Sequence, residues 1–200
     1  MDPLESAEAN NPRRRARVCF DATPGRSAVS RQYADAVNHK TSVNSSATYR
    51  VRPVRDNDVP GIVNLIRRVY AEYGQTLDQA EEPHVFDPGA YFRGHGGEFW
   101  VADADDTIVA TCGVKPVGDD AELKTLYVDA AHRRQGLARR LVDLSLAHAA
   151  ARDARRLILW SDTRFLDAHR LYQRLGFTLD GLRELKDSNL TWEFGFFKLL

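Results

Sequence analysis

Residues 132–141 read HRRQGLARRL, and the interpretation of the whole chain depends on this stretch. A basic run with a lone glycine comes directly before apolar residues spaced as on one helix face, namely Leu137, Leu141, Leu144 and Ala147. A turn between a strand and a helix binds anions well, because the first helical N–H groups lack intrahelical partners and the helix dipole adds positive potential. The stretch therefore predicts a phosphate-binding turn, and a solvated basic helix face is the simpler alternative.

The residue types in this turn suit a doubly charged anion. Gly136 has no Cβ to hold a ligand away from the backbone, and Ala138 keeps the next turn narrow. Arg133, Arg134 and Arg139 would add cationic partners for a pyrophosphate. A Walker loop needs Lys-Ser or Lys-Thr after its glycine, and a dinucleotide loop needs three glycines at fixed spacing. Neither pattern occurs in this turn, so ATP and NAD are disfavoured as ligands.

The sequence on both sides of the turn predicts an α/β fold built on a mixed sheet. Asp56 or Asp58 is expected to cap the first helix, with Pro60 in its first turn. The expected order is an antiparallel N-terminal meander, a parallel pair of strands in the middle, and helices on both faces. The predicted segments are a strand at 49–54, a helix at 59–73, an irregular stretch at 75–97, a hairpin at 99–114, a strand at 121–128, the helix after the turn, a buried strand at 155–162, a short helix at 167–175, and strands near 177–179 and 192–199.

Composition and charge limit the function classes. Residues 1–47 show no sustained period and predict a flexible tail, so the folded domain is expected over 48–200. The RRRAR run at 13–17 is either a nucleic-acid or targeting arm or an ordinary solvated tail. The 28 basic and 28 acidic side chains balance, which argues against a nucleic-acid binder. We also expect a cytoplasmic protein without a membrane segment, because no signal-peptide core and no apolar run near ~20 residues occurs.

The two cysteines are interpreted as reduced. Cys19 and Cys112 are far apart in sequence and have different surroundings, so a disulfide framework is not indicated. Cys112 lies in an apolar strand and is expected to be a small core residue.

Three motifs follow one another in a characteristic order along the chain. The run from Arg133 to Ala138 fits the pattern R/Q-x-x-G-x-G/A. Before it, ELKTLYV at 122–128 looks like a cofactor-binding strand, and after it AHRLYQRLGF at 168–177 fits A-x-x-L-Y-x-x-x-G-F. By these motifs, residues 49–200 resemble the GNAT superfamily of acyl-CoA N-acyltransferases, and the final TWEFGFFKLL resembles the last strand of many members.

The resemblance implies a GNAT-like fold with acetyl-CoA as acyl donor and no metal. The donor is expected where the strands at 121–128 and 156–162 diverge and leave backbone groups for the pantetheine amides. Many members carry an asparagine where this chain has Phe165, so Ser161 or Thr163 is a candidate replacement for that contact. The implied donor-binding residues are Leu126, Tyr127, Val128, Arg133, Arg134, Gln135, Gly136, Leu137, Ala138 and Arg139.

The resemblance also implies a reaction in which an amine attacks a thioester carbonyl, so a base must take a proton and an acid must protonate the leaving sulfur. Glu122 is predicted as the base, acting directly or through a water, and a surface ion pair with Lys124 or an arginine is its alternative role. Along a regular strand, Glu122, Lys124 and Leu126 would share one face. Tyr172 is predicted as the acid, since a phenol with a pKa near ~10 keeps its proton at neutral pH. Packing in the core is the alternative for Tyr172.

The implied activity is transfer of acetyl to a primary amine by direct attack in a ternary complex. The acceptor is a small molecule, a peptide or a protein, and it would be selected by the helix at 59–73, the segment at 75–97 and the last hairpin. The alternative function is a non-catalytic acyl-CoA sensor or partner-binding module on the same fold. A monomer or a homodimer is expected.

Overall fold

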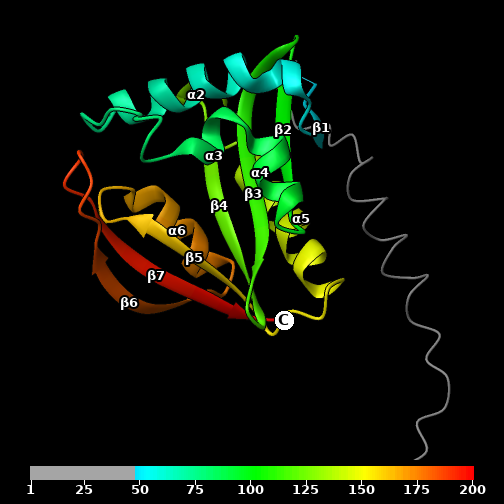
Figure 1. The fold of residues 1–200 in the computed structure, drawn as a ribbon, viewed down its shortest axis with the longest axis vertical. Helices are drawn as coiled ribbons and strands as arrows, with labels where there is room; N and C mark the ends of the chain where they lie inside the picture. Colours follow the sequence, from blue (N-terminus) through cyan, green and yellow to red (C-terminus); the bar gives the residue numbers. More distant parts are fainter. Residues whose placement is uncertain (1–47) are drawn as a thin grey trace, which may run out of the picture.

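The computed structural model describes residues 48–200, so the predicted tail at 1–47, with its RRRAR run, lies outside the described residues. Within them, seven strands form one sheet in the order β1-β2-β3-β4-β5-β7-β6. Neighbouring strands are antiparallel except for the central pair, β4 and β5, which is parallel (Figure 1). The strands are β1 (Arg50–Pro53), β2 (Glu98–Ala104), β3 (Thr107–Val117), β4 (Asp120–Val128), β5 (Arg156–Asp162), β6 (Thr178–Glu184) and β7 (Trp192–Leu199).

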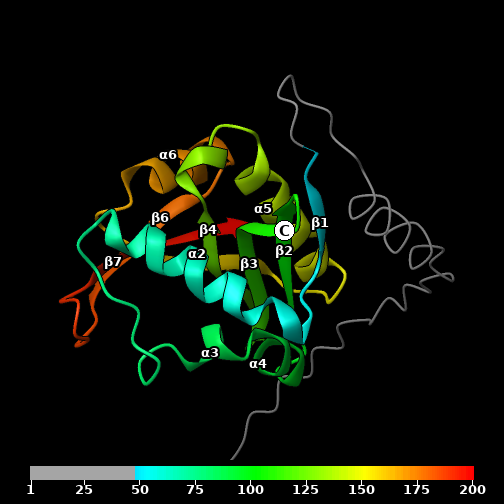
Figure 2. The same cartoon turned by 90° about the horizontal axis from the view of Figure 1, so that it is seen from above.

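Helices cover both faces of this sheet, as Figure 2 shows from above. Each face has its own core, because alternate strand residues point to opposite sides. Phe92 and Phe99 belong to the core under the first group of helices, and Leu141 and Leu159 belong to the other. The predicted α/β fold class is therefore confirmed. The first group is α2 (Val59–Ala71), α3 (Pro83–Phe86) and α4 (Pro88–Gly94), and the second is α5 (Leu137–Ala150) and α6 (Leu166–Arg174).

The start of α2 differs in detail from the prediction. Pro60 lies in its first turn as expected, and the stripe of apolar residues is buried. The residues expected to cap it instead form a short 3-10 helix, Asp56–Asp58. The Asp58 carboxylate accepts hydrogen bonds from the Arg52 guanidinium at 2.7 and 2.8 Å and from the Arg55 backbone N–H at 2.7 Å. A buried ion pair to β1 therefore takes the side chain away from the N-terminus of α2.

The segment at 75–97 is not irregular throughout, because it contains α3 and α4. Both helices begin at a proline, and the Asp87 carboxylate accepts the Ala90 backbone N–H at 3.1 Å to cap α4. Val85 and Phe92 are fully buried against the sheet. The two helices are only 4 and 7 residues long, and α4 contains glycines, so the sequence shows no helical period there. Packing of Val85 and Phe92 stabilises them.

The C-terminal strands are present, but β6 is longer than the predicted strand near 177–179. It lies at the edge of the sheet and pairs only with β7. Nearly every residue of β6 is exposed, so its sequence carries no alternation of buried and exposed positions. The full length of β6 could therefore not be predicted from a period in the sequence.

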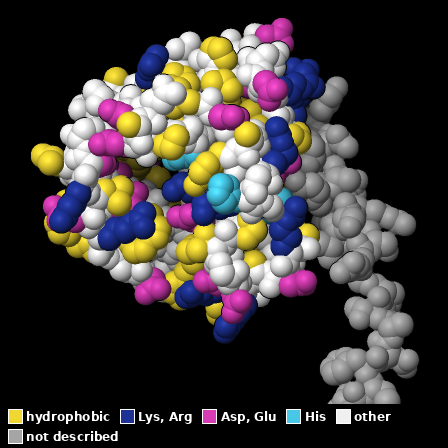
Figure 3. All heavy atoms as spheres, in the orientation of Figure 1, with side chains coloured by type: hydrophobic (Ala, Val, Ile, Leu, Met, Phe, Trp, Pro, Cys, Tyr) yellow, Lys and Arg dark blue, Asp and Glu magenta, His cyan; other side chains and the backbone are white. Residues whose placement is uncertain are grey.

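Charged groups of both signs are mixed over the face of the molecule in Figure 3, in keeping with the balanced composition. None of the helices found between residues 48 and 200 has the length and apolar character needed to cross a bilayer.

Candidate functional site

The central parallel strands separate along their length. Residues 121–123 of β4 pair with residues 157–159 of β5, and beyond these the two strands no longer pair. Both strands continue past this point, β4 to Val128 and β5 to Asp162. Beyond Leu123, the backbone of β4 is therefore not paired with β5. The divergence expected from the resemblance is confirmed.

A β-bulge in β4 lies at the point of divergence. Opposite β3, Lys124 pairs with Gly113 and Tyr127 pairs with Thr111, so β4 carries an extra residue between them. Thr125 has a φ of +57° there. After the bulge, Leu126 packs against the α5 side of the sheet, while Tyr127 packs against the α2 side. The expectation that Glu122, Lys124 and Leu126 share one face is therefore wrong, because the extra residue reverses the alternation.

The turn after β4 has the geometry predicted for anion binding. A 3-10 helix, Ala130–His132, follows β4, and α5 starts at Leu137 directly after Gly136. Gly136 has a φ of +79°, and a Cβ built on it would meet nothing within 4 Å. The backbone at Gly136 is therefore open to a ligand, as an anion site at the start of α5 requires.

One cavity of about 600 Å³ joins this turn to the divergent strands. Every predicted donor-binding residue except Gln135 lines it. The residues of α2 and α6 that line the cavity were not predicted as donor-binding residues from the sequence. On α6, Arg170 and Arg174 lie four residues apart on one helix face. This spacing was the available signal. The residues that line the cavity are Val69, Tyr73, Leu126, Tyr127, Val128, His132, Arg133, Arg134, Gly136, Leu137, Ala138, Arg139, Phe165, Asp167, Ala168, Arg170, Leu171 and Arg174.

Arg133 is already paired. Its guanidinium donates to both Glu72 carboxylate oxygens at 2.7 Å and to the Val128 carbonyl at 3.1 Å. The hydrogen bonds to Glu72 raise the pKa of Arg133 above its usual value. The predicted phosphate partner is thus neutralised by Glu72, and the cavity's other cations are Arg134, Arg139, Arg170 and Arg174.

Tyr172 lies on α6, next to the cavity residue Leu171, and its side chain packs in the hydrophobic core. Its ring packs against Phe177 and Phe196 and is only 4% exposed. Burial, and to a smaller degree Cys112, raises the pKa of its hydroxyl above the usual value, so the group keeps its proton at neutral pH. Within residues 48–200 this hydroxyl has no hydrogen-bond partner. A protonated donor without a protein acceptor fits the predicted acid, although Tyr172 is not part of the cavity lining.

Glu122, the predicted base, lies below the divergence, where β4 still pairs with β5. Its carboxylate is 3.3 Å from Lys115 Nζ and 3.9 Å from Lys124 Nζ. It is not among the residues that line the cavity. The structure therefore shows the alternative pairing with Lys124, and the role as base stays a prediction.

Several other side chains have contacts that bear on their predicted roles. Phe165 lines the cavity and packs edge-on against the rings of Tyr73 and Tyr127, with centroids 4.7 and 6.4 Å apart. Neither candidate replacement for the missing asparagine, Ser161 or Thr163, lines the cavity. Aromatic rings therefore occupy the position where a polar contact was expected.

Cys112 is buried in the core, where burial raises the pKa of its thiol to about 12. Its Sγ is 3.3 Å from the Ser145 hydroxyl, so it packs as the expected small core residue. In the part of the chain that the structure describes, no group of three or more His, Cys, Asp or Glu side chains is arranged to hold a metal ion.

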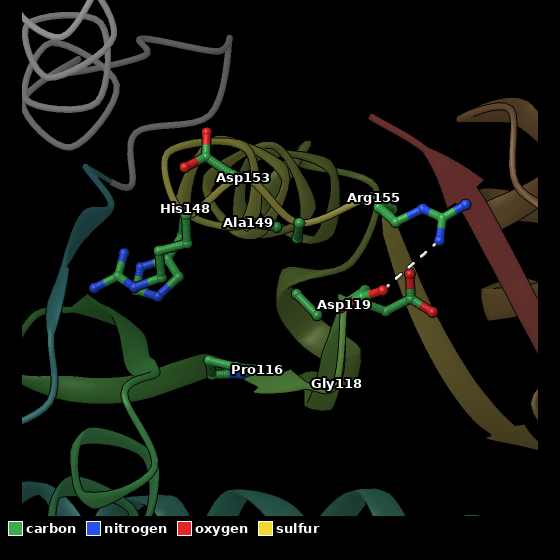
Figure 4. Close-up of a pocket in the computed structure, with 11 residues that line it drawn as sticks. Pro116, Gly118, Asp119, His148, Ala149, Asp153 and Arg155 are labelled. Atoms are coloured by element: carbon green, nitrogen blue, oxygen red, sulfur yellow. Dashed lines mark ion pairs between the residues drawn. The ribbon is translucent and has the colours of Figure 1, made fainter.

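A separate cavity of about 380 Å³ lies at the opposite end of α5, beside the turn between β3 and β4 (Figure 4). Asp119 and Arg155 line it and form an ion pair of 3.7 Å, with both side chains largely exposed. Burial lowers the pKa of the nearby His148 to about 4, so this side chain is neutral at physiological pH. None of the predicted donor-binding residues reaches this cavity.

Comparison with known proteins agrees with this geometry. The chain is 37% identical to N-acetyltransferase 8 of Homo sapiens over 98 residues, 46% of this chain and 43% of that protein. It is 30% identical over 127 residues to the uncharacterized N-acetyltransferase YjgM of Escherichia coli (strain K12), covering 60% of this chain and 76% of that protein. The chain thus spans less than half of the length of the human relative.

Solved structures share the fold. An acetyltransferase from Streptococcus agalactiae superposes with a TM-score of 0.68 at 20% identity, covering 76% of this chain and 98% of that one. YncA, described as a putative acetyltransferase from Salmonella typhimurium with its cofactor acetyl-CoA, has a TM-score of 0.61 at 15% identity, covering 76% of this chain and 94% of that one. The model of the acetyltransferase (GNAT) family matches residues 61–177, which include the divergent strands, the Gly136 turn and most of α2. Because this match covers more than half of the chain, the protein belongs to the acetyltransferase (GNAT) family.

Proposed function

We propose that this protein transfers an acetyl group from acetyl-CoA to a primary amine by direct attack in a ternary complex. The observation that carries this is a single cavity of about 600 Å³ lined both by β4 beyond its divergence from β5 and by the Gly136 turn. One site can thus hold an extended amide-bearing chain and a doubly charged phosphate group together. The solved relative YncA, described with acetyl-CoA, supports the choice of donor.

The two parts of the donor would use different groups. The backbone of Leu126 and Val128 would take the place of a strand partner for the pantetheine amides. The N–H groups at the start of α5 would hold the diphosphate, with Arg134, Arg139 and Arg174 as cationic partners. During transfer the amine nitrogen bonds to the carbonyl carbon, the carbon–sulfur bond breaks, and the sulfur leaves with a proton. We assign the delivery of that proton to Tyr172.

The acceptor would enter between α2, the loop at 75–82 and the β6–β7 hairpin. This loop is tied to the hairpin: the Thr76 N–H donates to Asn189 Oδ1 at 2.9 Å, and Glu81 accepts from the Ser188 N–H at 2.8 Å. We propose an acceptor amine on a small molecule, a peptide or a protein. The cytoplasmic location and the monomeric or dimeric state also remain predictions.

The first test is ligand-dependent stability followed by turnover. Acetyl-CoA should raise the free energy of unfolding, by about 2.7 kcal/mol at roughly 100 times its Kd, because it binds only the native state. ATP and NAD should have no comparable effect. The protein should then release free thiol with at least one amine from a panel of polyamines, amino sugars and peptides. Tight acetyl-CoA binding without thiol release above background would instead support the non-catalytic acyl-CoA sensor.

The Gly136→Val variant should bind acetyl-CoA roughly 5 to 30 times more weakly. A left-handed backbone costs a residue with a Cβ about 1–2 kcal/mol, so the turn of the free variant is expected to relax out of this conformation. Acetyl-CoA binding would have to restore it at the same cost, which corresponds to that change in Kd. Isothermal titration measures the change. Gly118→Val is the matched control, because Gly118 also has a positive φ of +58° and open space around its Cβ position, but lies on the β3–β4 turn far from the cavity. Equal Kd values for the two variants would contradict the assignment of the Gly136 turn.

A further inference from the structure

A carboxylate and two tyrosine hydroxyls form a continuous hydrogen-bonded chain that ends at the donor cavity. Glu82 lies directly before α3, and both of its carboxylate oxygens are 2.9 Å from the Tyr70 hydroxyl of α2. The Tyr70 hydroxyl is 3.0 Å from the Tyr127 hydroxyl of β4. Tyr127 lines the cavity. These contacts link a half-buried carboxylate to the space where acetyl-CoA and the amine would meet.

Hydrogen-bond chemistry gives this chain a direction. An ionised carboxylate can only accept, so the Tyr70 O–H donates to Glu82. The Tyr70 oxygen then accepts from the Tyr127 O–H, which leaves lone pairs on the Tyr127 oxygen for a donor in the cavity. A protonated amine is such a donor. We propose that Glu82 is the final acceptor of the proton lost by the attacking amine, and that the Tyr127 and Tyr70 hydroxyls carry it there.

The surroundings suit this role. Burial raises the pKa of both tyrosine hydroxyls, so both keep the protons that the relay needs. Burial also raises the pKa of Glu82 above its usual value, and the Tyr70 hydrogen bond and Lys124 oppose this shift in part. A carboxylate with a raised pKa is the better base at neutral pH.

The charges around Glu82 come from every element that packs near it. Lys124 of β4 favours the ionised form, whereas Asp187 of the β6–β7 loop and the neighbouring Glu81 disfavour it. Burial lowers the pKa of His84 in α3 to about 4, so His84 contributes no charge at neutral pH. Lys124 therefore favours the carboxylate, while burial and the two neighbouring acids make Glu82 easier to protonate than an exposed glutamate.

The loop that carries Glu82 is held in place at several points. The Gln75 side chain donates to Asp162 at the end of β5 at 2.7 Å, in a fully buried contact. The ties to Ser188 and Asn189 described above hold the loop to the hairpin. Because both ends of the loop are fixed, the carboxylate stays within reach of Tyr70.

Glu122 offers no comparable route. Its carboxylate pairs with two lysine ammonium groups, and it lies outside the cavity lining, in the part of β4 still paired with β5. Within residues 48–200, no side-chain hydrogen bond joins Glu122 to Tyr127 or to another cavity residue. The sequence singled out Glu122 from its place on the strand, but the connected carboxylate is Glu82.

The step, which rests on the proposed function, balances as follows. The ammonium group of the acceptor gives a proton to the Tyr127 oxygen, Tyr127 passes its own proton to Tyr70, and Tyr70 passes its own to Glu82. The freed nitrogen lone pair bonds to the acetyl carbonyl carbon as the carbon–sulfur bond breaks. Tyr172 gives its proton to the leaving sulfur, and the second nitrogen proton restores the Tyr172 hydroxyl, giving an amide and a thiol. Glu82 then returns its proton to water.

The test compares the pH dependence of kcat for Glu82→Gln and Tyr127→Phe with that of the wild type. Acetyl-CoA is saturating, and the acceptor is the amine that gives the fastest thiol release in the panel above. Glutamine keeps an oxygen that accepts the Tyr70 O–H but does not take up a proton. At neutral pH, kcat should fall about 10²-fold in Glu82→Gln, a typical loss for general base catalysis. The loss should shrink as the pH approaches the pKa of the amine, because a free amine needs no base.

The controls separate this role from a structural one. Glu98 of β2 pairs with Arg93 of α4, away from the relay, so Glu98→Gln should leave kcat unchanged. An unchanged kcat in Glu82→Gln, a loss of equal size at every pH, or a pH-dependent loss in Glu122→Gln alone would overturn the relay. Tyr127→Phe should show the same pH-dependent loss even if Glu82→Gln folds poorly. A wild-type protein that releases no thiol with any amine would overturn the proposed function, and the relay with it.

Discussion

The Tyr172→Phe variant is expected to transfer acetyl about 10²-fold more slowly than the wild type at saturating substrate, a typical loss for a general acid. Phenylalanine keeps the ring that packs against Phe177 and Phe196 and removes only the hydroxyl. Burial raises the pKa of that hydroxyl, so the wild type has the protonated form at neutral pH. Without it, the sulfur would leave as an unprotonated thiolate.

Stability measurements show whether this loss is chemical. The Tyr172 hydroxyl has no hydrogen-bond partner among residues 48–200, so its removal should leave the free energy of unfolding within about 1 kcal/mol of the wild type. The Kd for acetyl-CoA should also be unchanged. Tyr91→Phe is the control, because Tyr91 packs on α4 beside His84 and Phe92, outside the cavity. Wild-type kcat in Tyr172→Phe would show that Tyr172 is only a core residue.

The Arg52→Ala variant should lower the free energy of unfolding by about 3 kcal/mol, the scale of a broken buried ion pair. The Arg52 guanidinium, only 14% exposed, donates to Asp58 at 2.7 and 2.8 Å and to Asp103 at 2.9 Å. Both carboxylates are buried, so removing Arg52 leaves them with less compensation for their lost hydration. Asp58 joins β1 to the start of α2, and this connection would be weakened.

Arg50→Ala is the matched control. Arg50 also binds Asp103, at 3.2 Å, but its side chain is 58% exposed, so its removal should cost about 1 kcal/mol or less. Urea denaturation followed by tryptophan fluorescence measures both variants. Equal losses in the two variants would mean that burial of the Arg52 contacts contributes nothing.

The same ion pair should make stability depend on pH. Burial pushes the pKa of Asp58 up, but the hydrogen bonds from Arg52 and Arg55 outweigh burial, so its pKa lies below the ordinary value of 3.8. A carboxyl whose pKa is lowered in the folded state stabilises the protein above its unfolded pKa, and this contribution is lost as the pH falls through the folded pKa. The difference between the wild type and Arg52→Ala should therefore be full at neutral pH and shrink below about pH 4. A difference that is constant down to strongly acid pH would contradict this.

The local features of the donor site could be predicted from the sequence. The Gly136 turn combines a residue that tolerates positive φ with a basic run and an apolar helical repeat, and each of these signals lies within ten or so neighbouring positions. The apolar stripe of α2 and the buried character of β5 were readable for the same reason. The two short helices α3 and α4 were not, because they depend on packing of Val85 and Phe92 and not on a repeating pattern.

By itself, the sequence determined the order of the strands and of the helices α2, α5 and α6, and the anion-binding turn, because turn chemistry and periodicity depend on residues close together in the chain. Only the tertiary structure decided which side chains share the site. The bulge at Thr125 reversed the facing of β4, Glu72 neutralised Arg133 from 61 positions away, and Tyr127 met Tyr70 across 57 positions. These outcomes depend on how distant segments pack and which partners they bring within hydrogen-bond distance, and no local pattern encodes that.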